Sequence, residues 1–590
     1  MKIRVADYIA NLLVENGITN VFSVVGGGAM HLNDAFGRHK NIECIYNHHE
    51  QASAIAAEGY ARINNKMACV CVTTGPGGTN ALTGVLCAWL DSVPMIVISG
   101  QTRYETTVES TGLKLRQFGE QEYNIIESVK PMTKYAVMVK EPQSIKYHIE
   151  RAIYEATTGR KGPCWIDIPL DVQGSLVEDT QLSGYSLLKQ TMFAKDICAA
   201  IYEKIKTAKA PVIIVGSAVR QSDCLPAIYD LVSKLNIPVL CPTSVADAFH
   251  ISHPLYFGNF GVFGGRAGNF IIQNCDLMLS LGARMSFKQT GFNYSFFAPK
   301  AEKIVVDIDG EELRKNTLKI DIPIQADLVD IVASLNELIT EVLPQKTEWV
   351  DYCNRLKGRF NSMPEKAYSS VSVNPYYFAG KLQQKLPADS IIVVGNSCAC
   401  VSLLQMGISK KGQRIFGNVN CGTMGYDIPA AIGASLASKN SVICATGDGS
   451  FQMNIQELQT IVHNNLPVKF IVFNNGGYQA IVQTQKNFFS GVLSGCTRES
   501  GVSFPAFDKI AAAYGIPYKK ISCHNDIDDG IDWLISLNSY GLCEVIQDNN
   551  QLIEPKVMSK KMPDGSLVSP PIDDLSPFLE QEEYKKYAKF

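Results

Sequence analysis

The sequence has 590 residues, several times the size of a usual folding core of about 100 to 200 residues, so three or four domains are expected. Hydrophobic residues make up 46% and charged residues 19%, with a formal net charge of −3, as in an ordinary soluble globular protein. This balance excludes a strongly basic nucleic-acid-binding protein. The longest apolar runs, such as residues 94–98 and 211–215, are far shorter than the roughly 18 residues that cross a bilayer, so no membrane segment is expected.

The amino-terminal stretch, residues 5–14, places its apolar residues on one helical stripe and follows Lys2 and Arg4 without an apolar signal segment. We therefore expect it to belong to the mature protein. The cysteines are scattered through strand-like apolar stretches, their number is odd, and no C-x-x-C pair occurs. This usage predicts buried, reduced thiols and a cytoplasmic location.

Short runs rich in β-branched residues alternate with amphipathic segments of helical length. This alternation predicts an α/β fold in which parallel sheets are flanked by helices. Several runs end in glycine at the carboxyl end, where open α/β sheets bind their ligands, so we expect function on those loops. The predicted strands are residues 68–73, 95–99, 212–215, 277–281, 304–308, 391–394, 442–446 and 469–473.

Two breaks in composition divide the chain. A polar stretch covers residues 177–190, and a charged stretch with weaker turn signals covers residues 344–375. The end of the chain is rich in Lys, Asp and Pro and has too few apolar residues for another core. We expect three domains and a tail that lies over its own subunit or a partner, with approximate bounds 1–185, 190–340, 360–550 and 551–590.

The sharpest motif is Gly447-Asp448-Gly449, followed after 24 residues by Asn474-Asn475. Asp448 and Asn475 each end a predicted strand, and a helix predicted at 454–464 would bring their oxygen side chains to the same edge of the sheet. Mg²⁺ prefers such ligands, and the glycines let backbone N–H groups approach a diphosphate. Gly-Asp-Gly alone also occurs in ordinary turns, so the prediction of a Mg²⁺-diphosphate site depends on the asparagine pair.

Further segments extend this pattern over nearly the whole chain. They are His-Glu-Gln at 49–51, Gly-Tyr-Ala-Arg at 59–62, Thr-Gly-Pro-Gly-Gly-Thr-Asn at 74–80, Asp-Ser-Val-Pro at 91–94, Gly-Gln at 100–101 and Gly-Thr-Met-Gly at 422–425. With the motif, they make the chain resemble the thiamin diphosphate enzymes and, among these, the acetohydroxyacid (acetolactate) synthases. The resemblance implies three α/β domains with parallel sheets: pyrimidine-binding at 1–185, central at 190–340, and diphosphate- and Mg²⁺-binding at 360–550.

The resemblance also implies which residues bind the cofactor. Asp448 and Asn475 would ligate Mg²⁺ through their side chains, and Gly477 would do so through its carbonyl. Glu50 would hydrogen-bond the aminopyrimidine ring so that the cofactor removes its own C2 proton. Without the motif, Glu50 would be interpreted as an acid at the favourable end of a helix dipole. The other cofactor-binding residues are Gly75, Gly395, Asn396, Gly422, Met424, Gly447, Gly449 and Ser450.

Three more residues receive catalytic roles beside Glu50. Met424 would support the bent cofactor, with an ordinary core residue as the alternative, and Gly422 would offer its carbonyl to the 4′-amino group. Gln121 would approach the reacting intermediate, although Glu120 stands where the family has an aromatic residue.

The expected substrate pocket departs from the synthases. Ala480 stands in place of a Met, Thr484 in place of a Trp that packs on the acceptor, and Lys288 in place of an Arg that holds the acceptor carboxylate. The trimmed pocket leaves room for a larger or more polar acceptor. The other pocket residues are Glu120, Gln121 and the glycines that give backbone clearance beside the substrate, Gly27 and Gly28.

The predicted function is a thiamin diphosphate-dependent carboligase that decarboxylates pyruvate or another 2-oxo acid and transfers the two-carbon unit to a larger ketone or keto-sugar. The lack of histidine between His49 and His148 argues against the simple aldehyde release of pyruvate decarboxylases, which use a histidine pair. Three alternatives stay open. They are an acetolactate synthase that condenses two pyruvates in a valine, isoleucine or acetoin pathway, a 2-oxo acid lyase or oxidase, and a silent cofactor-binding subunit.

A second cofactor and the assembly also follow from the resemblance. The middle region resembles the site where these synthases hold a non-redox FAD, at Gly216, Gly282, Ala283, Arg284, Asp307 and Asp309. The departures at residues 285–287 leave a flavin-free site as an equal alternative. Because the family completes each active site with domains of two chains, we expect a homodimer or homotetramer with sites at the subunit interface.

Overall fold

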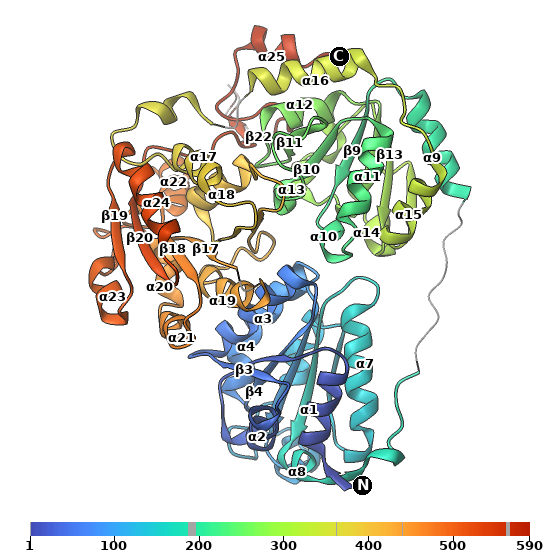
Figure 1. The fold of residues 1–590 in the computed structure, drawn as a ribbon, viewed down its shortest axis with the longest axis vertical. Helices are drawn as coiled ribbons and strands as arrows, with labels where there is room; N and C mark the ends of the chain where they lie inside the picture. Colours follow the sequence, from blue (N-terminus) through green and yellow to red (C-terminus); the bar gives the residue numbers. More distant parts are fainter. Residues whose placement is uncertain (1, 187–195, 361–362, 439, 562–563, 565–566) are drawn as a thin grey trace.

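The computed structural model describes residues 2–186, 196–360, 363–438, 440–561, 564 and 567–590. Within these residues the chain forms three six-stranded parallel sheets flanked by helices (Figure 1), which confirms the predicted α/β class. The runs predicted as strands are strands, with ends that shift by one or two residues at most. None of the described helices is both long and apolar enough to span a membrane.

The first sheet has the strand order β3-β2-β4-β5-β7-β6. Its strands are β2 (Asn20–Ser23), β3 (Glu43–Tyr46), β4 (Ala68–Val72), β5 (Met95–Gln101), β6 (Tyr135–Met138) and β7 (Pro163–Pro169). The short strands β1 (Lys2–Arg4) and β8 (Leu176–Glu178) pair beside it. The helices of this part are α1 (Val5–Glu15), α2 (Met30–Arg38), α3 (Glu50–Asn64), α4 (Pro76–Leu90), α5 (Val108–Thr111), α6 (Ile125–Val129), α7 (Ile145–Thr157) and α8 (Leu170–Gly174).

The second sheet has the order β11-β10-β9-β12-β13-β14. Its strands are β9 (Pro211–Val215), β10 (Val239–Pro242), β11 (Tyr256–Phe260), β12 (Leu277–Leu281), β13 (Glu302–Asp307) and β14 (Ile322–Gln325). The helices are α9 (Asp196–Thr207), α10 (Ala218–Gln221), α11 (Leu225–Leu235), α12 (Arg266–Asn274), α13 (Phe287–Thr290), α14 (Gly310–Arg314), α15 (Leu328–Leu338) and α16 (Thr347–Arg359). The expected start of this domain, residue 190, lies outside the described residues.

The third sheet has the order β16-β15-β17-β18-β20-β19. Its strands are β15 (Ile391–Val394), β16 (Arg414–Phe416), β17 (Val442–Gly447), β18 (Val468–Asn474), β19 (Tyr518–Ile521) and β20 (Gly541–Ile546). The helices are α17 (Pro375–Lys385), α18 (Ser397–Met406), α19 (Asp427–Ser438), α20 (Asp448–Met453), α21 (Glu457–His463), α22 (Gln479–Phe488), α23 (Phe507–Tyr514) and α24 (Ile527–Ser536).

The helix predicted at 454–464 is present as α21, which begins three residues later than predicted, at Glu457, and ends at His463. Residues 454–456 form a turn between α20 and α21. The chain turns there because the Asn454 side chain donates a hydrogen bond to the carbonyl of Gly425 (2.6 Å), which lies in a different loop.

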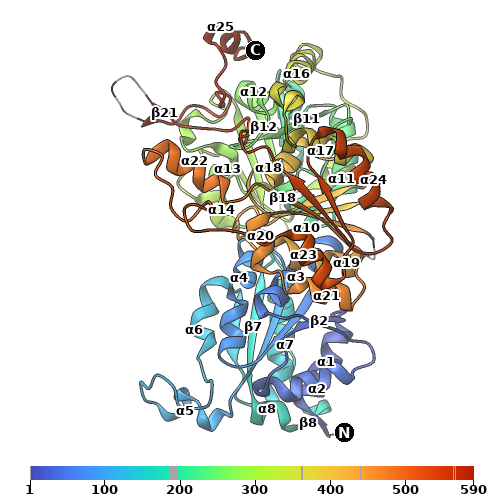
Figure 2. The same cartoon turned by 90° about the vertical axis from the view of Figure 1, so that its left-hand side faces the viewer.

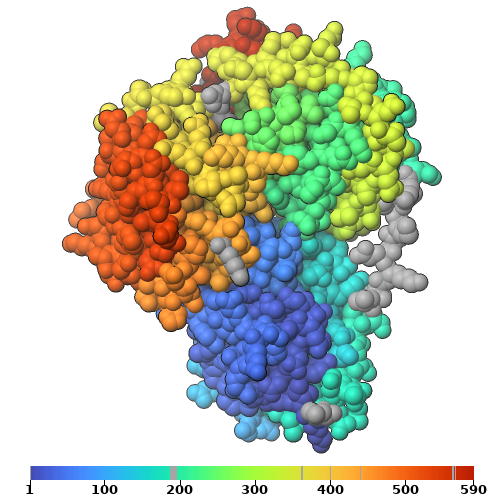
Figure 3. All heavy atoms as spheres, in the orientation of Figure 1, coloured from blue at the N-terminus to red at the C-terminus, as the bar shows by residue number. Residues whose placement is uncertain are grey.

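Helices α3 and α19 join the first and third sheets, as two views at right angles show (Figures 1 and 2). Both helices are rich in small residues, and a Cβ at Gly433 would collide with the carbonyl of Ala56. Glycine at this position therefore lets the two helices approach closely. One buried apolar cluster consequently spans both sheets. The space-filling view shows the blue amino-terminal part against both the orange and the green parts (Figure 3).

A buried ion-pair network strengthens this junction. Glu58 is fully buried and accepts hydrogen bonds from Arg62 (2.6 Å) and from the hydroxyl of Tyr426 (2.6 Å). Arg62 also pairs with Asp91 at the end of α4. Burial raises the pKa of Glu58, and the Arg62 charge counters this effect.

We expect Arg62→Ala to lower the free energy of unfolding by about 3 to 5 kcal/mol, because two buried carboxylates then lose their cation. The matched control is Arg38→Ala, which removes an exposed pair with Asp34 and should leave the urea midpoint near that of the parent chain. Urea unfolding followed by tryptophan fluorescence measures both variants. Equal midpoints for the two would contradict the role given to Arg62.

The tail, which includes β21 (Lys560–Lys561), β22 (Leu567–Val568) and α25 (Gln581–Tyr587), lies on its own chain. Ile572 and Leu575 are buried in the apolar cluster of the second sheet. Asn269 on α12 donates a hydrogen bond to the carbonyl of Ile572 (2.6 Å), and the hydroxyl of Tyr352 on α16 donates to the carbonyl of Tyr587 (2.6 Å). Of the two expected positions, the structure shows the one over its own subunit.

Candidate active site

The carboxyl ends of β17 and β18 bring together the two residues of the sharpest motif. The strands are parallel neighbours, and Gly447 pairs with Phe473. Asp448, which is 2% exposed, accepts hydrogen bonds from the backbone N–H groups of Gly449 (2.7 Å), Asn475 (3.0 Å) and Gly476 (2.7 Å). Burial raises the pKa of Asp448 to about 6, and the backbone hydrogen bonds oppose this rise. The Asp448 carboxylate is therefore fixed in position but costly to ionise without a cation nearby.

The oxygen atoms around Asp448 fit Mg²⁺. Asn475 Oδ1 accepts from the N–H of Gly477 (3.2 Å), which holds the amide oxygen and the Gly477 backbone near the carboxylate. Among the described residues, no group of three or more His, Cys, Asp or Glu side chains could hold a metal. A cation at Asp448 must therefore take its other ligands from amide, carbonyl, water or phosphate oxygens, which is the set that Mg²⁺ prefers.

Two further loops join the start of α20. Ser450 donates a hydrogen bond to the buried Asp427 (2.7 Å) and accepts one from the N–H of Gly425 (2.8 Å). Gly395 follows β15, and a Cβ at that position would collide with the same Asp427 carboxylate. Asp427 thus connects the loop after β15, the loop before α19 and α20.

Asn396, Gly422 and Met424 line the same junction. The Asn396 side chain donates to the carbonyls of Gly422 (3.0 Å) and Thr423 (2.8 Å). The half-buried Met424 side chain approaches Gly449. The structure therefore brings the predicted diphosphate-side residues together around Asp448, and the Gly422 carbonyl is already oriented by an amide.

Glu50 is the first residue of α3, and the His49 side chain before it accepts a hydrogen bond from the N–H of Gln51 (3.1 Å). Glu50 is 8% exposed, and Asn80 on α4 donates to its Oε2 (3.0 Å). This contact fixes the carboxylate at the start of α4. The structure therefore places Glu50 at the start of a helix, with its carboxylate held by Asn80.

The predicted pocket residues of the first sheet surround the ends of β2 and β4. Gly75, with φ +61°, contacts the carbonyl of Gln121 so closely that a side chain would not fit. Glu120 and Gln121 are exposed. The buried Gly28 donates from its N–H to Thr73 (3.0 Å), and the neighbouring Gly27 is exposed with open space around it.

The remaining pocket residues lie on α13 and α22. Ala480 and Thr484 are exposed one turn apart on α22, and the Thr484 hydroxyl donates to the carbonyl of Ala480 (3.0 Å). Lys288 on α13 is engaged elsewhere, because its ammonium donates to the carbonyl of Val419, and burial lowers its pKa. The structure therefore places Ala480 and Thr484 together and gives Lys288 a carbonyl partner.

A separate cavity of about 340 Å³ lies where the three sheets meet. Gly282, Ala283, Arg284 and Asp307 line it, and Gly216 lies beside it, bonded through its N–H to the carbonyl of Leu281 (2.9 Å). An acid at the end of a strand, such as Asp307, commonly binds a ribose, so these residues fit a nucleotide-like group. The volume is near the lower end of ligand pockets, which span about 300 to 1,000 Å³.

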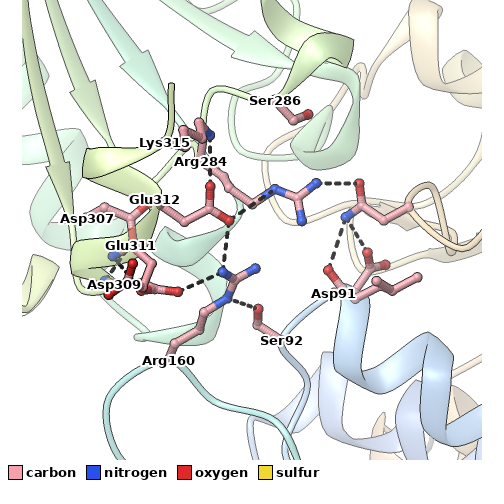
Figure 4. Close-up of polar contacts among 12 residues, drawn as sticks. Asp91, Ser92, Arg160, Arg284, Ser286, Asp307, Asp309, Glu311, Glu312 and Lys315 are labelled. Carbon is pink, nitrogen blue, oxygen red and sulfur yellow. Dashed lines mark hydrogen bonds and ion pairs between the residues drawn. The ribbon is translucent and has the colours of Figure 1, made fainter. Parts of the chain in front are cut away.

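Ion pairs close one side of this cavity (Figure 4). The Arg160 guanidinium lies between Ser92 (2.9 Å) and the acids Asp309 (2.9 Å) and Glu312 (2.9 Å). Arg284 donates to the side chain of Asn420 (3.3 Å) in the third part of the chain. The contact between Asp309 and Arg160 therefore connects the second sheet to the first. Asp309 is not among the residues that line the cavity of about 340 Å³.

Several site residues were missed from the sequence. Asn80 is the last residue of the Thr-Gly-Pro-Gly-Gly-Thr-Asn segment at 74–80, but its contact with Glu50 depends on how α3 and α4 cross. Asp427 could have been found as a carboxylate at the start of an otherwise apolar helix. The contact of Glu58 with Tyr426 could not have been found, because the two residues are 368 positions apart.

A buried hydrogen-bonded chain lies beneath the ends of β4, β5 and β7. Thr74 donates to Gln101, and Gln101 donates to Asp167 (3.1 Å). Asp167 also accepts from Ser99 (2.6 Å), which accepts from the Trp165 indole (2.8 Å). This chain supports the loop that begins α4.

Burial raises the pKa of Asp167 from 3.8 to about 7. Between roughly pH 4 and pH 7 the folded chain therefore holds a proton that the unfolded chain has lost, so stability falls as pH rises, by up to about 1.4 kcal/mol per pH unit. We expect Asp167→Asn to remove this component of the pH dependence. Urea unfolding at several pH values measures it, with the exposed Asp179→Asn as control. An unchanged slope in Asp167→Asn would contradict the assignment.

Comparisons with known proteins agree with this geometry. Three models of thiamine pyrophosphate enzymes match: the N-terminal TPP binding domain at residues 3–125, the central domain at 198–335 and the C-terminal TPP binding domain at 394–545. The fold and site thus define a thiamin diphosphate-dependent enzyme.

Curated relatives match along nearly the full chain. The acetolactate synthase isozyme 2 large subunit of Escherichia coli K12 is 28% identical, covering 97% of this chain and 100% of its own. The acetolactate synthase large subunit of Lactococcus lactis is 30% identical, covering 94% of both chains. The probable acetolactate synthase large subunit of Methanocaldococcus jannaschii is 31% identical, covering 92% of both. The chain belongs to the thiamin diphosphate enzyme family and is close to the acetolactate synthases.

Proposed function

We propose that this enzyme decarboxylates pyruvate and transfers the two-carbon unit to a second pyruvate, which forms acetolactate. The observation that carries the proposal is the Asp448 carboxylate, held by three backbone N–H groups next to Asn475. The names of the relatives support acetolactate formation over the larger acceptor that the sequence alone favours.

The residues at the end of the third sheet would bind the cofactor. Asp448, Asn475 and the Gly477 carbonyl would hold Mg²⁺, and the α20 N–H groups would face the diphosphate. Bound thiamin diphosphate supplies an electron sink for the loss of CO₂ from a 2-oxo acid. The Gly422 carbonyl would accept a hydrogen bond from the amino group of the pyrimidine, and Met424 would support the bound cofactor.

The residues of the first sheet would handle the proton and the substrate. Glu50, oriented by Asn80, would exchange a proton with the pyrimidine ring. Gln121, beside Gly75, would hydrogen-bond the reacting carbonyl, and Gly27 and Gly28 would leave space for it. Glu50 and Asp448 belong to different sheets, and we propose that at each site these sheets come from two chains of a homodimer or homotetramer in the cytoplasm.

A second candidate acceptor is a larger ketone or keto-sugar. The small side chains of Ala480 and Thr484 favour it, because they are exposed on one face of α22 and leave that side of the site without a bulky wall. In this alternative the donor and the decarboxylation step stay the same.

We propose a nucleotide-containing cofactor, with non-redox FAD as the first candidate, for the cavity between the three sheets. Support comes from the lining by Asp307, Arg284 and Gly282. The absorbance spectrum of the purified protein tests this directly, since a bound flavin absorbs visible light. We also propose the domain bounds 1–185, 190–340 and 360–550.

The two acceptors are distinguished by product mass. The purified protein is incubated with Mg²⁺, thiamin diphosphate and pyruvate, with and without a panel of ketones and keto-sugars. Acetolactate as the main product under every condition supports the proposal. An added ketone that gains two carbons and suppresses acetolactate would replace it with the second candidate.

We expect Thr484→Trp to lower the turnover of bulky acceptors by about 10-fold or more relative to pyruvate. The indole would fill the space beside the exposed face of α22 that a bulky acceptor needs. Competition between pyruvate and a bulky ketone, followed by product mass, measures this ratio. Lys486→Ala, farther along α22, is the control. An unchanged ratio would remove Thr484 from the acceptor site.

A further inference from the structure

A fully buried carboxylate of the third part of the chain holds a loop of the amino-terminal part. Glu457 is the first residue of α21, and α21 lies against the amino-terminal part in both views (Figures 1 and 2). Its Oε1 accepts a hydrogen bond from the backbone N–H of His48 (2.9 Å), and its Oε2 accepts one from the side-chain amide of Asn47 (2.9 Å), 410 positions earlier in the chain. Thr460 also donates to Oε2 (2.8 Å). The contacts of Glu457 with Asn47 and His48 are called the Glu457 clamp below.

The loop that the clamp holds ends directly before Glu50. Residues 47–49 connect β3 to α3, and Glu50 begins α3. Asn47 is buried, its N–H donates to the carbonyl of Ser23 (3.0 Å), and its Oδ1 accepts from the hydroxyl of Ser53 in α3 (3.1 Å). The Asn47 side chain thus bonds to Glu457 at one end and to α3 at the other, so the clamp bears on the start of that helix.

The hydrogen-bond pattern of the clamp requires a carboxylate. Both oxygens of Glu457 accept from donors on the loop, and the buried Asn47 amide would have no acceptor if the carboxylate were removed. A glutamine of the same shape has one acceptor oxygen, and its N–H₂ group would face a donor. Size alone therefore does not reproduce the clamp.

The segment that ends in the clamp begins at the proposed metal site. Asp448 is the first residue of α20, and Glu457 follows the turn after that helix. In this turn the Asn454 side chain donates to the carbonyl of Gly425 (2.6 Å) and to the side chain of Gln51 (3.4 Å). The α20–α21 segment therefore contacts the amino-terminal part on both sides of Glu50.

We propose that Glu457 is a positioning residue for Glu50. It fixes residues 47–49, and with them the backbone from which the Glu50 side chain extends toward Asn80. The effect on proton exchange rests on the proposed function of Glu50, whereas the restraint of the loop does not.

Amide hydrogen exchange of the full-length protein tests the restraint. In Glu457→Ala, exchange in residues 46–53 should be faster than in the parent chain by about 10-fold or more, because the loop loses two hydrogen bonds to the third part. Exchange in β12, residues 277–281, should stay at the parental rate. The control Asp573→Asn removes a buried carboxylate from the tail and should leave residues 46–53 unchanged.

Exchange of the C2 proton of bound thiamin diphosphate, followed by NMR, tests the positioning of Glu50. We expect Glu457→Ala to bind the cofactor with parental affinity and to lose about 10-fold to 100-fold in this rate. Glu457→Gln should lose activity in the same direction. Adding Asn47→Asp to Glu457→Gln should restore the rate, because the new carboxylate accepts from the new amide and still accepts from the hydroxyl of Ser53.

Each result decides one part of the proposal. Unchanged hydrogen exchange in residues 46–53 of Glu457→Ala would overturn the restraint. A parental C2 rate in Glu457→Ala, while Glu50→Gln loses that rate, would overturn the positioning of Glu50, and so would a double variant no faster than Glu457→Gln. A parental C2 rate in Glu50→Gln itself would contradict the proposed function and with it the positioning role, and hydrogen exchange alone would then decide the restraint.

Discussion

The variant Asp448→Ala should lose Mg²⁺ and thiamin diphosphate, with at least about a 100-fold decrease in cofactor affinity. In the parent chain three backbone N–H groups fix the carboxylate beside Asn475, and burial raises its pKa to about 6, so a cation is needed to offset the cost of the charge. The alanine removes both the charge and the ligand. Calorimetric titration of the apoprotein with thiamin diphosphate in the presence of Mg²⁺ measures the affinity.

The matched control for this experiment is Asp532→Ala on α24. Asp532 is exposed and pairs only at the surface with Lys385, so the variant removes a carboxylate from the same part of the chain without touching the site. Its cofactor affinity should equal that of the parent. Cofactor binding by Asp448→Ala at the level of this control would show that the metal lies elsewhere.

The variant Glu50→Gln should keep the cofactor but lose about 100-fold to 10,000-fold in turnover. The amide has the shape of the carboxylate and can still accept the hydrogen bond from Asn80, so the start of α3 should remain intact. It cannot exchange a proton with the pyrimidine. Exchange of the C2 proton of bound thiamin diphosphate for deuterium, followed by NMR, measures the step directly.

Glu43→Gln on β3 is the control for Glu50, since Glu43 is exposed and contacts the side chain of Asn20. It should exchange C2 protons at the parental rate. Normal exchange in Glu50→Gln would leave Glu50 with the alternative role of an acid at the start of a helix.

Local patterns predicted most of the fold. The strands β4, β9 and β15 are apolar runs with β-branched residues, bounded by turns, so their positions follow from sequence alone. The start of α21 at Glu457, three residues after the predicted start, does not, because the Asn454 side chain in the preceding turn bonds to the carbonyl of Gly425, 29 positions earlier. The packing of α3 on α19 also combines residues that are distant in the sequence.

In the candidate site, too, some contacts were predicted from the sequence and others were not. Asp448 and Asn475 were predicted to be neighbours because parallel strands end at one edge of the sheet. The contact of Lys288 with the carbonyl of Val419 was not, since it joins α13 to a loop 131 positions away. Spacing along the chain reveals neighbours on one sheet, and it does not reveal contacts between sheets.

Release of labelled CO₂ from carboxyl-labelled pyruvate would show whether this enzyme decarboxylates pyruvate with thiamin diphosphate. The purified protein is stripped of cofactors and then supplied with Mg²⁺ and thiamin diphosphate, singly and together. We expect CO₂ release only when both are present, together with an acetolactate product. Equal release without thiamin diphosphate, or none from pyruvate in a protein that binds the cofactor, would contradict it.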